Sequence, residues 1–436
     1  MENYFKEFKK KIKGRKVNIA VIGLGYVGLP LAVEFAKKRF SVTGIDLDKD
    51  RVKKIKAKTS YITDVPSSGI KKIIDSGYFK ASADFSLLKH SDVIIICVPT
   101  PLKSKYYPDI SFILSAVKGV KKFLQPNQLI ILESTTYPGT TEEILKPILE
   151  SGGLKCGKDF YLAFSPERID PGNKKYPVYK IPKVMGGITP QSTELTAALY
   201  RNIVSKVVPV SSARVAETVK LLENTFRIVN IALIDEMAMM AHKMNIDIWE
   251  IIEAAKTKPF GFMPFYPGPG VGGHCIPKDP LYLYWKAKHH GFESRFIKLS
   301  SGIINYMPLY VTERLRDILS DNKINLADAR ILIVGVSYKK DVLDLRKSPA
   351  LDIIGLLSKK NIKVSYYDPL VPYLKFGRIN LKSIKLNSKE LKKYDCVIIT
   401  ADHSRVDYNF ILKNSPRIFD TRNIYKGVED RKIIRL

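Results

Sequence analysis

The residues best suited to covalent chemistry lie in a glycine-rich segment near the middle of the chain. This segment reads Pro267-Gly268-Pro269-Gly270-Val271-Gly272-Gly273-His274-Cys275, and Lys278 and Asp279 follow it. So many glycines indicate unusual backbone dihedral angles or a close approach of the backbone to another group. Cations and backbone N–H groups beside a thiol favour the reactive thiolate. Cys275 is therefore the candidate nucleophile.

Three further side chains are candidates for binding or polarising an oxygen atom of the substrate. Lys220 and Asn224 are four residues apart in a helical stretch, so they lie on one face about a turn apart. A lysine beside an amide can bind an oxyanion or polarise an alcohol. Glu167 lies in Phe164–Asn173, a segment dense in charges and turn residues, which is typical of a functional loop.

A second motif predicts a dinucleotide site near the N-terminus. Gly23-Leu24-Gly25-Tyr26-Val27-Gly28 follows an apolar strand and opens a helix, and Asp46 ends the next strand 18 residues after Gly28. Gly23 permits the tight turn, Gly25 lets the backbone approach a pyrophosphate, and Gly28 permits close packing of helix and strand. Asp46 would accept hydrogen bonds from a ribose 2′-OH and would repel a 2′-phosphate. NAD is therefore favoured over NADP, although Arg51 lies close by.

A dinucleotide fold combined with a nucleophilic thiol indicates a two-step oxidation. NAD takes an alcohol to an aldehyde, the thiolate adds to the aldehyde, and a second hydride transfer gives a thioester that is hydrolysed. The product would be a carboxylic acid, and two NAD would be consumed in each turnover. The alternative is an alcohol dehydrogenase that stops at the aldehyde, and the Cys275 loop argues against it.

The elements that position these residues predict an α/β protein. Continuous β-rich runs, such as Val93–Val98, alternate with helices in both the first and last parts of the chain, which indicates parallel sheets covered on both faces. Ala213–Met244 contains no Gly or Pro, and it predicts one helix roughly 45 Å long. We expect two Rossmann-like doubly wound domains joined by a central helical region with this long helix. The expected boundaries are 1–210 for an NAD-binding domain, 211–320 for the central domain and 321–436 for a UDP-binding domain.

The last α/β domain lacks the glycine triplet, so a second NAD is not expected there. Its first strand runs into Gly335-Val336-Ser337-Tyr338-Lys339-Lys340. Together with Arg346, these lysines would suit another anionic group such as a nucleotide diphosphate. Ordinary solvated lysines would give the same pattern.

Composition limits the remaining classes of function. The 436 residues contain 72 Lys and Arg against 43 Asp and Glu, a formal net charge of +29. Such a charge suits anionic partners, but no nucleic-acid recognition motif supports a DNA- or RNA-binding protein. The four scattered cysteines include no CxxC pair, which disfavours a zinc ribbon, another metal site or a disulfide framework. No apolar run is long enough to span a membrane, and the Lys-rich N-terminus lacks the apolar core of a secretory signal, so a cytoplasmic enzyme is expected.

Taken together, the motifs resemble the UDP-glucose/GDP-mannose dehydrogenase family of nucleotide-sugar 6-dehydrogenases. The resemblance runs from Val17 to about Asn423. Its motifs are GLGYVG at 23–28, VPTP at 98–101, ESTTYPGT at 133–140, SPERIDPGN at 165–173, Lys220-x-x-x-Asn224, GPGVGGHCIPKDP at 268–280 and YKKDVLDLRKSPAL at 338–351. The 165–173 motif and the FYPGPGVGGHC loop are similar to the UDP-N-acetylglucosamine branch. The UDP-glucose branch usually has an Arg before the glycine loop. Phe262–Phe265 holds no Arg, so a contact that the UDP-glucose enzymes take from a partner subunit is not expected here.

The resemblance implies a role for each site residue. Cys275 would be the nucleophile, Lys220 would stabilise the oxyanion, and Asn224 would position the substrate oxygen. Asp279 and Thr135 would hold or activate the water, and Glu167 would act as acid and base in thioester hydrolysis. The implied NAD-binding residues are Gly23, Leu24, Gly25, Tyr26, Val27, Gly28, Asp46, Arg51, Thr100, Thr135 and Arg346. The implied substrate-binding residues are Glu167, Arg168, Lys220, Asn224, Tyr266, Gly270, Lys339 and Arg422.

The resemblance also implies a substrate and an assembly. The substrate would be a UDP-N-acetylhexosamine, most simply UDP-N-acetyl-D-glucosamine, oxidised at C6. UDP-glucose, UDP-N-acetylgalactosamine and UDP-N-acetylmannosamine remain alternatives, because the sequence does not fix the orientation of one hydroxyl. The acid product would suit a route to cell-surface polysaccharide. A homodimer through the long helix is expected.

Overall fold

The chain folds into two compact units. The computed structural model describes residues 2–62, 65–104, 107–168, 176–273 and 275–436. The first unit comprises Met1–Glu223 and Leu281–Phe292, and the second comprises Asn224–Pro280 and Glu293–Leu436. The division falls inside the long helix α8 (Ala213–Lys243), which matches the helix predicted from the sequence. The three-domain division stays a prediction.

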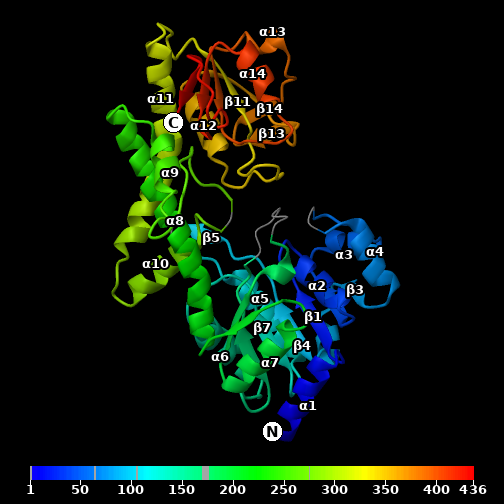
Figure 1. The fold of residues 1–436 in the computed structure, drawn as a ribbon. Coiled ribbons are helices and arrows are strands. Elements are labelled where there is room, and N and C mark those ends of the chain that lie inside the picture. The colour runs from blue at the N-terminus through cyan, green and yellow to red at the C-terminus, as the bar shows by residue number, and fades with distance from the viewer. Residues whose placement is uncertain (1, 63–64, 105–106, 169–175, 274) are drawn as a thin grey trace. The chain divides into compact units, whose positions relative to one another are not determined.

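An eight-stranded sheet forms the centre of the first unit (Figure 1). Its strands, in spatial order, are β10 (Val207–Pro209), β9 (Lys183–Gly187), β8 (Tyr161–Phe164), β7 (Leu129–Leu132), β4 (Val93–Ile96), β1 (Asn18–Ile22), β2 (Ser41–Ile45) and β3 (Phe79–Ser82). The strands from β8 to β3 are parallel, as predicted. β9 runs antiparallel to β8 and parallel to β10, so the sheet carries a reversed edge that the sequence pattern did not predict.

Both faces of this sheet are buried, which explains its continuous apolar strands. In β1, Ile19 and Val21 join one hydrophobic cluster, whereas Ala20 and Ile22 join another on the opposite face. The helices of the first cluster are α1 (Glu2–Lys13), α2 (Gly28–Lys37), α3 (Lys49–Lys56), α4 (Ser67–Asp75) and α7 (Pro190–Tyr200). Those of the second are η1 (Phe85–His90), α5 (Ser111–Phe123), η2 (Thr140–Leu145), α6 (Lys146–Glu150) and the start of α8. Each fully buried Ile or Leu side chain stabilises the fold by about 2 kcal/mol.

The order of the strands determines where a ligand can bind. The chain leaves β1 toward β2 on one side and returns to β4 on the other, so the connections reverse direction between β1 and β4. In parallel sheets, the crevice outside the carboxyl ends of the strands at this point holds the ligand. The segments that follow β1, β2, β4 and β7 all begin at this edge.

The second unit contains a five-stranded, wholly parallel sheet. Its strands, in spatial order, are β12 (Lys363–Tyr367), β11 (Arg330–Val334), β15 (Cys396–Ile399), β16 (Ile418–Asp420) and β17 (Ile433–Arg435). The helices of this unit, apart from its part of α8, are α9 (Ile248–Ala255), α11 (Arg295–Ser320), α12 (Pro349–Lys359), α13 (Ser388–Leu391) and α14 (Tyr408–Asn414). In β11, Ile331 and Ile333 join a cluster with α11 and α12, whereas Leu332 and Val334 join the opposite cluster. Two Rossmann-like sheets with a helical region between them in sequence confirm the predicted fold class.

The remaining elements are short or cross the division. They are the hairpin strands β5 (Leu102–Ser104) and β6 (Tyr107–Pro108), the hairpin strands β13 (Tyr373–Phe376) and β14 (Ile379–Lys382), the turn η3 (Val178–Lys180), and α10 (Asp279–His289).

Candidate active site

The glycine motif after β1 has the geometry of a phosphate-binding turn. Gly23 has a positive φ of 91°, and a Cβ there would overlap the carbonyl of Cys97. A Cβ on Gly28 would overlap the carbonyl oxygen of Gly23, so α2 starts in close contact with the turn. A Cβ on Gly25 would meet nothing within 4 Å, which leaves that backbone open to a ligand at the N-terminus of α2. The motif therefore fits a dinucleotide pyrophosphate.

Asp46, directly after β2, lies beside this turn. Its Oδ2 accepts a hydrogen bond from the Leu24 N–H at 2.8 Å, and the Arg51 guanidinium lies 3.3 Å from the same oxygen. The hydroxyl of Tyr61 donates to the Leu24 carbonyl at 2.6 Å, and Arg51 lies over the Tyr61 ring. Asp46 and Arg51 are thus in contact, and the Tyr61 ring, which no sequence motif indicated, packs beside them.

The other predicted cofactor residues of the first unit lie at the same edge of the sheet or close to it. Tyr26 is half exposed, and Val27 lines a cavity. Thr100 is buried, and its carbonyl accepts a hydrogen bond from the Tyr282 hydroxyl. Thr135 is partly buried and follows β7.

Lys220 and Glu167 form a buried ion pair in the first unit. The Lys220 Nζ lies 3.7 Å from the Glu167 Oε2, and both side chains are about nine-tenths buried. Burial excludes the reading of Lys220 as a solvent-facing helix residue. A buried ammonium beside a carboxylate can donate to an oxyanion while the carboxylate accepts a proton.

Arg168, the next residue, is held by protein groups. Its guanidinium lies 2.5 Å from a carboxylate oxygen of Glu223 and also donates to the Pro182 carbonyl at 2.5 Å. The rest of the predicted motif, Ile169–Asn173, lies outside the described residues. The role of Arg168 in substrate binding stays a prediction.

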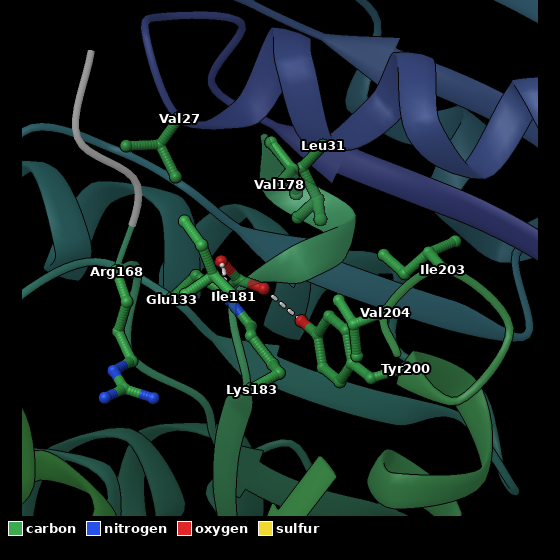
Figure 2. Close-up of a pocket in the computed structure, with 10 residues that line it drawn as sticks. All are labelled: Val27, Leu31, Glu133, Arg168, Val178, Ile181, Lys183, Tyr200, Ile203 and Val204. Carbon is green, nitrogen blue, oxygen red and sulfur yellow. Dashed lines mark hydrogen bonds and ion pairs between the residues drawn. The ribbon is translucent and has the colours of Figure 1, made fainter. Parts of the chain in front are cut away.

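A cavity in the first unit contains a buried charged cluster that sequence reasoning missed (Figure 2). Glu133, directly after β7, accepts a hydrogen bond from the Tyr200 hydroxyl and lies 2.8 Å from the Lys183 Nζ. Burial and the neighbouring carboxylate raise the pKa of Tyr200. Glu133 stands in the ESTT motif, but no pattern marks Lys183 or Tyr200. Apolar side chains complete the wall: Val27, Leu31, Val178, Ile181, Ile203 and Val204.

In the second unit, the predicted residues Asn224 and Asp279 are in contact. The Asn224 Nδ2 donates to the Asp279 Oδ2 at 2.6 Å, and both side chains are buried. The Cys275 carbonyl accepts from the N–H groups of Asp279 and Lys278 at 2.9 and 3.1 Å, which places the thiol residue one turn before α10. Burial, followed by the charges of Lys347 and Arg346, lowers the pKa of Lys278. A partly buried thiol with this cationic surrounding is suited to nucleophilic attack.

The other three cysteines have the surroundings of inert thiols. Cys97 directly follows β4 and Cys396 begins β15, and both are buried. Burial raises the pKa of Cys396 to about 12. Burial also raises the pKa of Cys156 to about 12. All four cysteines lie in the described part of the chain, and none is joined in a disulfide.

The glycine loop before Cys275 requires its glycines. Gly270 and Gly273 have φ values of 125° and 86°, and a Cβ on Gly272 would overlap the Tyr338 side chain. The Gly273 N–H donates to the Arg346 carbonyl at 2.8 Å. The loop is therefore held against the segment that carries Lys339, which is partly exposed, and Arg346, whose side chain is half exposed and pairs with Asp344. His274 lies outside the described residues.

Arg422 lies at the start of the same loop. Its Nε donates to the Thr400 carbonyl at 2.9 Å, and its guanidinium fills the space that a Cβ on Gly268 would need. The Gly268 N–H donates at 3.0 Å to the Oδ1 of Asp235, a buried residue of α8 that sequence reasoning missed. Burial raises the pKa of Asp235 to about 8, and its Oδ2 has no hydrogen-bond partner in the described structure.

Tyr266 stands at the edge of this loop with nearly half of its side chain exposed. Its hydroxyl donates to Glu253 at 3.2 Å, and its ring stacks on Trp249. An exposed ring beside the glycine loop is compatible with the predicted contact to substrate.

The second sheet has the same framework but a different carboxylate environment. Asp368 follows β12 as Asp46 follows β2, and Gly335 follows β11 with a φ of 86°. Asp368 accepts from the N–H groups of Val336 and Leu370 at 2.7 and 2.8 Å and pairs with buried His403. Asp46 also accepts from backbone N–H groups, those of Leu24 and Asp48, so the two carboxylates differ in their side-chain partner: partly exposed Arg51 for Asp46 and fully buried His403 for Asp368.

Among the described residues, no group of three or more His, Cys, Asp and Glu side chains could hold a metal ion. No helix in the described ranges is long and apolar enough to cross a membrane.

Comparisons with known proteins match nearly the whole chain. Residues 17–204 match the NAD binding domain of the UDP-glucose/GDP-mannose dehydrogenase family. Residues 214–305 match the family's central domain, and residues 332–427 match its UDP binding domain.

Individual relatives include enzymes named for different sugars. A UDP-N-acetyl-D-glucosamine 6-dehydrogenase of Pseudomonas aeruginosa is 39% identical over 82% of this chain and 84% of its own. A UDP-N-acetyl-D-mannosamine dehydrogenase of Pyrococcus horikoshii is 35% identical over 94% of this chain and 96% of its own. The solved structure of the UDP-D-ManNAc dehydrogenase from Pyrococcus horikoshii matches with a TM-score of 0.87 and 34% identity, covering 96% of this chain and 98% of that one.

Proposed function

The chain belongs to the UDP-glucose/GDP-mannose dehydrogenase family and is an NAD-dependent nucleotide-sugar dehydrogenase, and we propose that it oxidises C6 of UDP-N-acetyl-D-glucosamine to the acid in two steps. The observation that supports this most is a pair of contacts on successive turns of α8. Lys220 pairs with Glu167 in the first unit, and Asn224 bonds to Asp279 in the second. The sequence motifs selected all four residues separately.

The residues of the chain have distinct roles in the proposed reaction. Bound NAD would supply the hydride acceptor, with two molecules consumed in each turnover. Gly25, Asp46 and Arg51 hold it, together with Thr100, Thr135 and Arg346. Arg168, Tyr266, Gly270, Lys339 and Arg422 hold the sugar and its diphosphate.

Cys275 carries the covalent step. The alcohol is first oxidised to an aldehyde, and the Cys275 thiolate then forms a C–S bond to the aldehyde carbon while the carbonyl electron pair moves to oxygen. Loss of a second hydride from that carbon gives the thioester. Water attacks the thioester, and the C–S bond breaks to release the acid and the protonated Cys275 thiol.

The buried polar pairs assist these steps. Lys220 donates to the developing oxyanion, and Asn224 positions the substrate oxygen. Asp279, with Thr135, holds the attacking water, and Glu167 takes its proton and returns it to the departing thiolate.

The test is the amount of NADH formed per UDP-sugar consumed. UDP-N-acetylglucosamine is expected to give a ratio of two, with the acid as the product. A ratio of one would mean that the reaction stops at the aldehyde, and it would contradict the role of Cys275. Parallel assays with UDP-glucose, UDP-N-acetylgalactosamine and UDP-N-acetylmannosamine test the sugar, because a higher kcat/KM on any of them would replace the substrate proposed.

A homodimer through α8 is the second part of the proposal. A row of apolar side chains at helical spacing stays exposed along α8: Leu222, Phe226, Leu233 and Met240. Their side chains are 46–61% exposed, which is costly for large apolar groups that recur along one helix. A second copy of the same helix would bury the row symmetrically.

A further inference from the structure

A buried carboxylate next to the predicted catalytic residues is not assigned a role by the proposed mechanism. Glu217 on α8 is completely buried. Its Oε2 accepts from the Gly139 N–H at 2.6 Å, and its Oε1 accepts from the Thr141 N–H at 2.9 Å and the Thr141 hydroxyl at 2.7 Å. Three donors from one short segment therefore converge on one carboxylate.

These three donors belong to the turn that follows Thr135. Thr136 and Thr140 are buried and hydrogen-bonded to each other at 2.7 Å, and the Thr140 hydroxyl also donates to the Tyr137 carbonyl. The turn leads into η2 through Gly139, whose φ of 95° puts the backbone in the left-handed region. Because the turn is buried, its N–H groups need acceptors, since an unpaired buried N–H costs free energy.

The same carboxylate connects this turn to the catalytic lysine. Glu217 and Lys220 are three residues apart on α8, so they lie on neighbouring parts of one helix face. We propose that Glu217 is a positioning residue, which fixes the turn carrying Thr135 against the helix that carries Lys220. This inference rests on the proposed function, because Thr135 and Lys220 have their roles there.

The electrostatic surroundings of Glu217 make its charge sensitive to pH. Burial raises its pKa to about 7, and the Thr141 and Gly139 hydrogen bonds and Arg214 oppose that rise. The other titratable neighbours are Tyr137 on the turn, Glu143 on η2 and Lys286 on α10, which pairs with Glu143. Above about pH 7 the ionised carboxylate accepts all three hydrogen bonds. Protonation adds a donor that competes with them.

The kinetic test compares three substitutions. Glu217→Gln keeps the side-chain shape but places an amide NH₂ against the donors, and we expect kcat to fall at least about tenfold while KM for the UDP-sugar changes less than about threefold. Thr141→Val removes one of the three donors, and a fall of about threefold is expected. Glu142→Gln, on the exposed side of η2, is the matched control and keeps the wild-type kcat. The kcat of the wild type should fall as pH drops through about 7, and Glu217→Gln should lose this dependence.

A second measurement keeps the inference separate from the proposed function. Hydrogen exchange of the peptide covering residues 135–145, followed by mass spectrometry at pH 8, needs no substrate. Glu217→Gln should speed exchange there at least about tenfold, and Glu142→Gln should not. Unchanged exchange in Glu217→Gln would overturn the proposal, as would a wild-type kcat and pH profile. If no UDP-sugar yields NADH while exchange rises as expected, the proposed function fails and the positioning of the turn stands.

Discussion

At the scale of single residues, the surroundings of each cysteine determine how easily its thiol ionises. Cys275 lies partly buried beside Lys278, whereas burial raises the pKa of Cys156 and Cys396 to about 12. A thiol held neutral by burial is a poor nucleophile. The thiolate that the proposed reaction requires can therefore form at Cys275, beside Lys278.

Cys275→Ser is expected to lower formation of the acid by at least about a thousandfold, because a hydroxyl in that loop remains protonated. Any remaining turnover should stop at the aldehyde, with one NADH formed per sugar consumed. Cys156→Ser is the control and should keep the wild-type rate. Acid formation by Cys275→Ser at the wild-type rate would rule out the covalent route.

The sequence indicated most of the candidate site because its motifs are local. Gly23 to Gly28, the Lys220–Asn224 spacing and the loop at Cys275 all depend on near neighbours in the chain. Lys183, Glu217 and Asp235 could not be found in this way, because each acquires its meaning from a partner far away in sequence. Glu217 meets a turn about 76 residues earlier, and only the fold brings them together.

At the scale of elements, periodicity predicted the parallel strands and the long helix well. α8 spans Ala213–Lys243 against a prediction of 213–244. The reversed strands β9 and β10 were not predicted, because a short apolar strand looks the same in either direction. Direction is set by the length of the connection and by pairing with β8, which involves only Ala163–Gly187 and Phe164–Gly186.

The exposed row on α8 predicts the assembly. Leu233→Asp places a charge in the middle of the row, and we expect it to shift the protein from dimer to monomer in light scattering after size-exclusion chromatography. Leu343→Asp is the matched control, since Leu343 is exposed to a similar degree outside α8. A wild-type chain that runs as a monomer at micromolar concentration would contradict the proposed dimer.

At the scale of the whole molecule, buried carboxylates determine how stability depends on pH. Burial raises the pKa of Asp235 to about 8 from an ordinary value of 3.8. The folded state therefore holds a proton that the unfolded chain has lost between these values, and the resulting stability disappears as pH rises through about 8. The net charge of +29 acts in the opposite direction, because repulsion among the basic groups is greatest at low pH and eases as pH rises.

Asp235→Asn should remove much of this dependence. The amide keeps the Oδ1 acceptor for the Gly268 N–H and replaces the oxygen that has no partner. Between pH 6 and pH 8.5, the wild type is expected to lose about 2 kcal/mol of unfolding free energy that the variant retains. Urea unfolding at the two pH values measures the difference. Equal losses in both proteins would mean that Asp235 is ionised across this range.

The two carboxylates that end corresponding strands have a consequence for protein engineering. Both accept backbone N–H groups, but Asp46 pairs with Arg51, whose side chain is 41% exposed, whereas Asp368 pairs with the fully buried His403. Grafting a glycine triplet after β11 would therefore recreate the phosphate turn beside a carboxylate that a buried histidine occupies. A designer who wants a second cofactor in this scaffold must first replace His403 and then supply new partners for the groups it leaves behind.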